Sequence, residues 1–288
     1  IRDRFKTDID GSLADGGQFS HAQDTDVPTG QGFKFSSKCA VVNQVTQPSS
    51  AGHLNQLYTM LEHQDVLHLE WGTANAKTVT LSFWVKSSVT GTYNLWMDYY
   101  VTSDQKRYNT TYTISSANTW EKKIITLTGP TSGGQSTRTD EAGFRLEWLL
   151  GASSAYETGT LDEWYDSTAT FRTAAGSVYF NENAVGSTWY LTGVQFETGS
   201  VATPFEHRSF LDEYLRCCRY YFGGSRYGAG PAYYGSVYSS GNSMVRVPHP
   251  VPMRTNPTAS QPTFGGGGSY STVYENTNVT QYYITGDT

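Results

Sequence analysis

The stretch TVTLSFWVK at residues 78–86 decides the fold class of this chain. Apolar and polar side chains alternate along it, which is the period of two of a β-strand that buries one face. We expect the core-facing side chains to be Val79, Leu81, Phe83 and Val85. The opposite face then carries Thr80, Ser82, Trp84 and Lys86.

The next apolar stretch, YNLWMDYYV at residues 93–101, alternates in the same way. Its core-facing side chains would be Tyr93, Leu95, Met97, Tyr99 and Val101. The other face would carry Asn94, Trp96, Asp98 and Tyr100. A tryptophan on a face that is otherwise polar is unusual, because large aromatic side chains are mostly buried. Both stretches therefore predict a strand with a tryptophan on its outward side.

Similar strand patterns recur outward from these two stretches, separated by turn-forming segments such as TGPTSGG and GASS. The predicted strands cover residues 33–45, 66–71, 78–86, 93–101, 108–114, 121–127, 143–150, 177–181 and 189–197. Only 16% of the residues are charged, 14% are aromatic and 29 are glycine, a composition of strands and turns. The sequence therefore predicts a mainly β protein with an antiparallel β-sandwich of jelly-roll type.

A helix is predicted after the last strand of the sandwich. Pro204 disfavours helix just before it, and Ser209 can cap a helix over Phe210–Tyr221. Beyond it the chain is rich in Gly, Tyr and Ser, and short strands predict a second small β-rich domain. We expect a lead-in at 1–26, a jelly-roll at 27–204, a linker and helix at 205–222, and the C-terminal domain at 223–288.

Net charge, hydrophobic content and cysteine content exclude several classes of partner and cellular environment. The formal net charge is −6, so the basic surface that nucleic acid requires is not expected. No run of about 18 apolar residues occurs, so membrane insertion is not expected. Cys39, Cys217 and Cys218 are predicted to be free thiols in a reducing cytoplasm. Because Ile1 is not a starting methionine, further residues are expected to precede it.

Several long segments carry a family resemblance. They are DTDVPTGQGFKFSSK at 24–38, VTLSFWVKSSVTGTY at 79–93, YTISSANTWEKKIITLTG at 112–129, YLTGVQFETGSVATPFEHRSFLDEYLRCCRYY at 190–221 and VPMRTNPTAS at 251–260. In this order they resemble structural proteins of marine bacteriophages, of the tail-fibre or carbohydrate-binding-like virion group. Cys218 stands where this pattern more often has Gln, and Phe210–Leu211 replaces a usual Tyr–Gly pair.

The resemblance implies a jelly-roll of carbohydrate-binding-module type, a linking helix and a further β-region in a virion component. It implies a protein assembled in the host cytoplasm, exposed on the particle, forming a homotrimer and contacting other virion proteins. Three roles remain open at this stage. One is adhesion of a tail fibre or spike to host surface polysaccharide. The second is a non-adhesive structural role, as a capsid decoration, head fibre or connector. The third is a depolymerase that would shorten host polysaccharide.

The outward tryptophans give the candidate binding site. A sugar ring stacks on a flat aromatic side chain, and its hydroxyls need polar partners. The two strands offer this chemistry, if they pair side by side, through Trp84, Trp96, Tyr100, Asn94, Asp98 and Lys86. The alternative is that another part of the chain or a neighbouring subunit covers this face.

No catalytic, metal or cofactor site is predicted. Motifs of the HExxH, GxSxG and P-loop type are missing from the sequence, and so is a Ser-His-Asp order. Asp8, Asp10 and Asp15 lie in DIDGSLADGG, but the full calcium-loop pattern with its terminal Glu is not there. A solvated acidic loop is the simpler interpretation, and a structural cation stays open. We expect a binding or structural protein rather than an enzyme.

Overall fold

The computed structural model describes most of the chain. The described residues are 5–10, 18–44, 46, 54–101, 105–135, 141–157, 159–166, 171–222, 235–239, 242–257, 269–275 and 277–285. The chain divides into two compact units, Ile1–Glu206 and His207–Thr288. Each unit is described by itself below.

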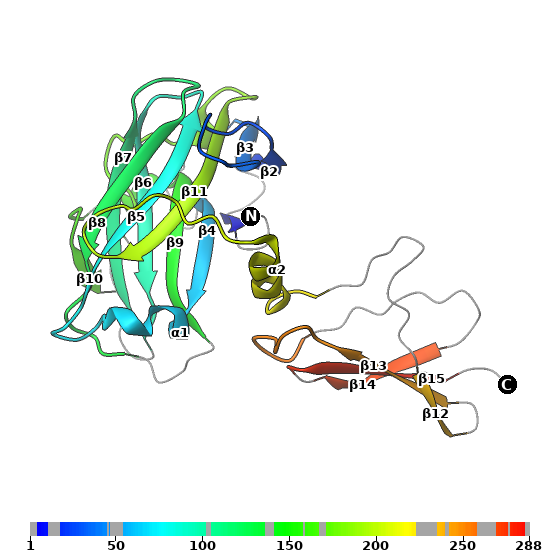
Figure 1. Cartoon of the computed structure of the whole chain (residues 1–288). Coiled ribbons are helices and arrows are strands. Elements are labelled where there is room, and N and C mark those ends of the chain that lie inside the picture. The colour runs from blue at the N-terminus through cyan, green and yellow to red at the C-terminus, as the bar shows by residue number, and fades with distance from the viewer. Residues whose placement is uncertain are drawn as a thin grey trace. The chain divides into compact units, whose positions relative to one another are not determined.

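The first unit is built from two antiparallel sheets (Figure 1). Sheet A has the order β1 (Phe5–Asp10), β4 (Leu54–Glu62), β9 (Ala142–Ala152), β6 (Gly91–Tyr99), β7 (Lys106–Ile114), β10 (Trp164–Asp166). Sheet B has the order β2 (Gln18–Asp24), β3 (Ser36–Asn43), β11 (Thr188–Thr198), β5 (Thr78–Ser87), β8 (Glu121–Thr128). The outer face of each sheet is the face turned away from the other sheet.

The strand order confirms the predicted jelly-roll. Within sheet A the order β4-β9-β6-β7 stands against β3-β11-β5-β8 in sheet B. These are the two interleaved four-stranded sheets of a jelly-roll, in which the chain crosses repeatedly from one sheet to the other. Strands β1, β2 and β10 extend the sheets at their edges.

The core lies between the sheets and follows the predicted alternation. Both predicted core faces are buried at Val79, Leu81, Phe83, Val85, Tyr93, Leu95, Met97, Tyr99 and Val101. Trp148 packs at right angles to Phe83, with 5.5 Å between ring centroids. Burying a Phe or Leu side chain stabilises a fold by about 1.5–3 kcal/mol, so these two strands form the central part of the sandwich.

Two predicted strands are wrong. Residues 66–69 lie in the helical segments α1 (His63–Val66) and η2 (Leu67–Leu69), where Val66 and Leu69 are both buried at helical spacing, and residues 70–71 form no strand. The strand in this region is β4, which the sequence did not predict. Residues 177–181 form no strand and run into the 3₁₀-helix η4 (Phe180–Glu182). Another 3₁₀-helix, η3 (Ser154–Tyr156), follows β9.

The expected lead-in at 1–26 is also corrected. Strand β1 pairs with β4, and β2 pairs with β3. Phe5 packs on Trp148 with 5.9 Å between ring centroids. The segment belongs to the sandwich because its apolar side chains reach the core. Cys39, Cys217 and Cys218 are free thiols, as expected.

The second unit begins with the predicted helix. Helix α2 spans Phe210–Cys218, and the Ser209 hydroxyl accepts a hydrogen bond from the Asp212 N–H at 3.2 Å. Four antiparallel strands follow in the order β12 (Gly235–Ser239), β13 (Asn242–Pro248), β15 (Val279–Thr285), β14 (Ser269–Glu275). Among the described residues no helix is long and apolar enough to cross a membrane.

Candidate functional site

The structure divides the six predicted site residues between two faces. Strand β5 pairs with β11 and β8, whereas β6 pairs with β7 and β9. The condition on which the combined site depended, that the two strands pair side by side, is therefore not met. Trp84 and Lys86 lie on the outer face of sheet B. The outer face of sheet A carries the other four, Asn94, Trp96, Asp98 and Tyr100.

The outer face of sheet A holds a dense group of polar and aromatic side chains, which we call the arginine–aromatic face. Its members are Gln56, Tyr58, Asn94, Trp96, Asp98, Tyr100, Arg107, Asn109, Arg145, Glu147, Tyr165 and Arg172. The strand register brings them together, because Asp98 stands opposite both Arg107 and Arg145, and Trp96 stands opposite both Asn109 and Glu147. Charged residues on three different strands thus meet on one surface.

Arg145 is the centre of this face. It forms an ion pair with Glu147, whose side chain is fully buried. Its guanidinium lies 4.1 Å from the centroid of the Tyr58 ring, and it hydrogen bonds with Tyr100. With its amide oriented to satisfy both neighbours, Gln56 donates to Glu147 Oε2 at 2.8 Å and accepts from Arg145 Nη2 at 2.7 Å. Burial alone would lower the pKa of Arg145, but the interactions with Glu147, Tyr100 and Tyr58 together outweigh it and raise that pKa.

Asp98 is a buried carboxyl with incomplete compensation. It is 2% exposed, its Oδ2 lies 3.8 Å from Arg107 Nε, and no described group hydrogen bonds to its Oδ1. Burial raises its pKa, although Arg107, Arg172 and Arg145 oppose that effect. Asn109 is fully buried, and neither amide atom has a hydrogen-bond partner in the described part of the chain. Such groups cost about 1–3 kcal/mol each when unsatisfied, and native folds rarely keep them without a reason.

Trp96 is not the exposed stacking surface that the sequence predicts, since it is only 1% exposed. The Arg172 guanidinium lies 4.2 Å from its ring, and its Nε1 donates to the Tyr165 hydroxyl at 3.1 Å. It packs on the outer side of the sheet with Leu54, Leu149, Ala152 and Tyr179. Trp96 is thus covered by the segment between β9 and β11.

The same segment also reaches Asn94, whose Oδ1 accepts a hydrogen bond from the Ala174 N–H at 2.8 Å. Tyr58, Tyr100 and Tyr165 are the rings of this face that are half-buried, and Tyr58 and Tyr100 both contact Arg145. Burial raises the pKa of Tyr100, so its hydroxyl stays protonated at neutral pH, and it hydrogen bonds with Arg145 and Asp98. The accessible part of the face therefore combines tyrosine rings with guanidinium groups.

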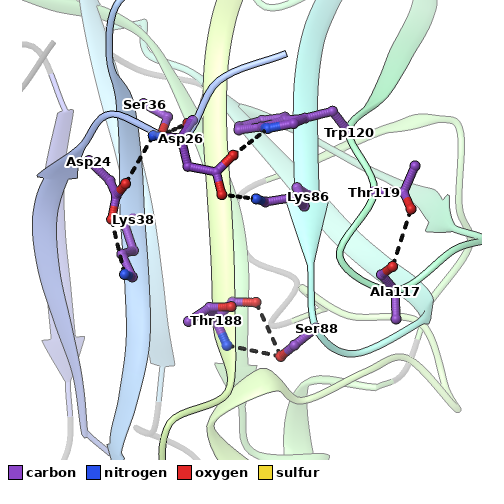
Figure 2. A network of polar contacts seen from close by, with 10 residues as sticks. All are labelled: Asp24, Asp26, Ser36, Lys38, Lys86, Ser88, Ala117, Thr119, Trp120 and Thr188. Atoms are coloured by element: carbon purple, nitrogen blue, oxygen red, sulfur yellow. Dashed lines mark hydrogen bonds and ion pairs between the residues drawn. The ribbon is translucent and has the colours of Figure 1, made fainter. Parts of the chain in front are cut away.

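Trp84 and Lys86 lie in a different environment on sheet B. Lys86 is 7% exposed and forms an ion pair with Asp26, while Trp84 is half-buried. Figure 2 shows the Asp26 carboxylate between Lys86 and Trp120, and Trp120 Nε1 donates to it at 2.9 Å. Trp120 was not predicted as a site residue, because nothing in the neighbouring sequence distinguishes it from a core tryptophan.

The sequence analysis also missed Tyr58, Arg107, Arg145, Glu147 and Arg172. A local signal existed for Arg145 and Glu147, since GFRLEWLL at 143–150 alternates and turns both outward. The register that places them beside Asp98 comes from strand pairing, which alternation does not reveal. In the described residues no group of three or more His, Cys, Asp or Glu side chains is placed to hold a metal ion. The side chains of Asp8, Asp10 and Asp15 lie outside the described part.

Comparison with known proteins gives fold-level likenesses. No protein-family model and no curated protein matches this sequence. The enzymatically active domain of tailspike protein 4 from bacteriophage CBA120 matches 68% of this chain, which spans only 19% of that protein, with 12% identity and a TM-score of 0.38. A family 4 carbohydrate-binding module matches 68% of this chain and 88% of its own, with 15% identity and a TM-score of 0.35. The family 11 module of a Clostridium thermocellum cellulase has 9% identity and a TM-score of 0.34, covering 69% of this chain and 90% of its own.

Proposed function

We propose that the jelly-roll binds carbohydrate through the arginine–aromatic face, as the adhesive part of a phage tail fibre or spike that attaches to host surface glycans. The observation that carries the proposal is the polar floor of this face. Asp98 and Asn109 are almost fully buried on the outer side of a sheet, where the jelly-roll core does not need them, and among the described residues Asp98 Oδ1 and both Asn109 amide atoms have no hydrogen-bond partner. Buried, incompletely satisfied polar groups beside solvent-accessible rings are typical of ligand sites.

The chemistry of this face suits a sugar. Tyr58 and Tyr100 offer flat rings for the apolar side of a pyranose. The arginine guanidinium groups can donate hydrogen bonds to sugar hydroxyls, and the carboxylates can accept them. Arg145 is held by Glu147, Gln56 and Tyr58, so its donors are pre-oriented and little side-chain entropy is lost on binding.

The virion location and the trimer are supported by the sequence resemblance alone. A fibre with three copies would gain avidity, because linked sites raise overall binding by about 10²–10⁴ over a single site. A weak site for each chain is therefore compatible with firm attachment of a particle.

The test is binding of the full chain to soluble polysaccharides, with laminarin, xylan, alginate and carrageenan as neutral and acidic probes. Tyr100→Ala is expected to weaken binding about tenfold, since loss of one ring contact and one hydrogen bond amounts to about 1.4 kcal/mol. Thr113→Ala, on the exposed end of β7, is the matched control and should bind as wild type does. If the correctly assembled chain binds none of the probes, the non-adhesive structural role is favoured instead.

A further inference from the structure

We propose that the outer face of sheet B carries a second, independent carbohydrate-binding surface built on Trp84 and Trp120, so that one sandwich is bivalent. This surface shares no residue with the arginine–aromatic face and lies on the opposite side of the core. It goes beyond the function proposed above, because it holds or fails whichever ligand the arginine–aromatic face binds.

The two tryptophans are neighbours on one face. In the register of β5 with β8, Trp84 stands opposite Lys122 and Val85 opposite Glu121. Trp120 comes one residue before β8, and it therefore stands beside Lys86 and diagonally from Trp84. Such diagonal neighbours in a sheet lie about 7–8 Å apart. Both rings are half-buried, so each keeps a solvent-accessible part.

Trp120 is held in place by charged partners. Its Nε1 donates to Asp26 Oδ1 at 2.9 Å, and the other oxygen of Asp26 pairs with Lys86. The Lys86 ammonium lies 5.4 Å from the centroid of the Trp120 ring and 4.4 Å from that of Tyr190 (Figure 2 shows Lys86, Asp26 and Trp120). A ring fixed in this way loses little entropy when a ligand stacks on it.

Trp84 has an indole N–H that is available to a ligand. Among the described residues it makes no hydrogen bond through its indole N–H and no ring contact, and its side chain is half-buried. The Lys122 side chain opposite it is exposed. An indole N–H and an ammonium group can both donate to sugar hydroxyls. Trp84 thus offers a free donor and a free ring surface next to the fixed ring of Trp120.

The composition of the surface favours a saccharide over a protein partner. The rings are interrupted by Lys86, Lys122 and Asp26, and Ile124 is the one large apolar side chain nearby that is more than half exposed among the described residues. Protein interfaces bury a larger continuous area with a fully desolvated centre. Two rings bordered by hydrogen-bonding charges match the alternating apolar and hydroxyl surfaces of a sugar chain.

The experiment measures binding stoichiometry per chain. The full protein is titrated by calorimetry with oligosaccharides cut from whichever of laminarin, xylan, alginate and carrageenan it retains in an affinity gel. Wild type should show two sites per chain. Trp84→Ala and Trp120→Ala should each weaken one of them at least tenfold, while Ile124→Ala, an exposed position on the same face, should leave both unchanged.

The two proposals fail separately. Loss of one site in Tyr100→Ala and of the other in Trp84→Ala supports both surfaces, and the combined variant should then bind nothing. Loss of binding in Trp84→Ala but not in Tyr100→Ala supports the sheet B surface and excludes the arginine–aromatic face as a binding site. The inference is overturned if both tryptophan variants, with unchanged near-ultraviolet circular dichroism, keep wild-type stoichiometry and affinity, or if none of the four polymers binds.

Discussion

The Arg145–Glu147 ion pair allows a quantitative test of how the arginine–aromatic face is held together. Glu147 is fully buried, so Arg145→Met leaves a carboxylate without its charge partner inside the protein. Breaking a buried pair by removing one member costs about 3–5 kcal/mol. A unit of this size loses about 2–4 °C of melting temperature per kcal/mol, so the expected fall is about 6–20 °C.

Removing both charges should cost less than removing one. Arg145→Met combined with Glu147→Gln leaves no unpaired charge, and the remaining loss is that of neutral hydrogen bonds and packing, about 0.5–1.5 kcal/mol for each hydrogen bond. The double variant is therefore expected to be about 2 kcal/mol more stable than Arg145→Met alone, which is within the range of measured couplings between contacting residues.

The assay is differential scanning calorimetry of the full chain. The unfolding transition of the sandwich is identified by following near-ultraviolet circular dichroism over the same temperature range. Lys77→Met is the matched control, because the Lys77–Glu70 pair is 44% exposed at each side chain. Exposed pairs contribute about 0–1 kcal/mol, so its melting temperature should barely move. The reasoning is refuted if Arg145→Met is no less stable than the double variant, or if it falls no further than Lys77→Met.

Four other outcomes are expected. Burial raises the pKa of Asp98, so its charged form destabilises the folded state at neutral pH. The melting temperature of Asp98→Asn should therefore equal or exceed that of wild type at pH 7. This advantage should disappear below about pH 4, where Asp98 is protonated in both states, and melting curves at the two pH values test it. Burial would raise the pKa of Asp26, but hydrogen bonds from Lys86 and Trp120 hold that pKa low. The charged Asp26 carboxylate should therefore stabilise the fold above about pH 4, and this contribution should be lost below. In denaturant titrations, wild type should lose more stability than Asp26→Asn when the pH is lowered into this range. Ser209→Ala should cost helix α2 about 1 kcal/mol, seen as faster amide hydrogen exchange there. Gly129→Ala would place a methyl group 2.0 Å from the Trp71 ring and should cost about 1–3 kcal/mol in a denaturant titration.

The elements that depend on local pattern were predictable from the sequence. Alternation at 78–86 and 93–101 placed each core face correctly, because in a sandwich every second side chain must leave water. Ser209 was identified as a cap because a hydroxyl before a helix satisfies an otherwise unpaired N–H. These features are set within about ten residues, and the sequence carries them directly.

The pairing of strands could not be predicted in the same way. Strands β5 and β6 are separated by only a few residues, a spacing that usually indicates a hairpin. Here the link crosses from sheet B to sheet A: the Ser88 N–H donates to Thr188 O, and the Val178 N–H donates to Thr92 O. This crossing separates Trp84 from Trp96. It depends on residues about 100 positions later in the chain, and local alternation gives no information about such distant contacts.

The outer faces show where the rule of polar side chains in water breaks down. Asn94, Asp98 and Glu147 stand on the polar side of their strands, yet each is at most 2% exposed. The segment between β9 and β11 contacts Asn94 through the Ala174 N–H and brings Arg172 near Asp98, and a fold under selection for stability alone would place apolar side chains beneath it. Conflicts between local pattern and burial are expected at functional sites. On the outer face of sheet A such conflicts lie beside the half-buried side chains of Tyr58, Tyr100 and Arg145, and this coincidence is the physical reason for proposing that this face binds a ligand.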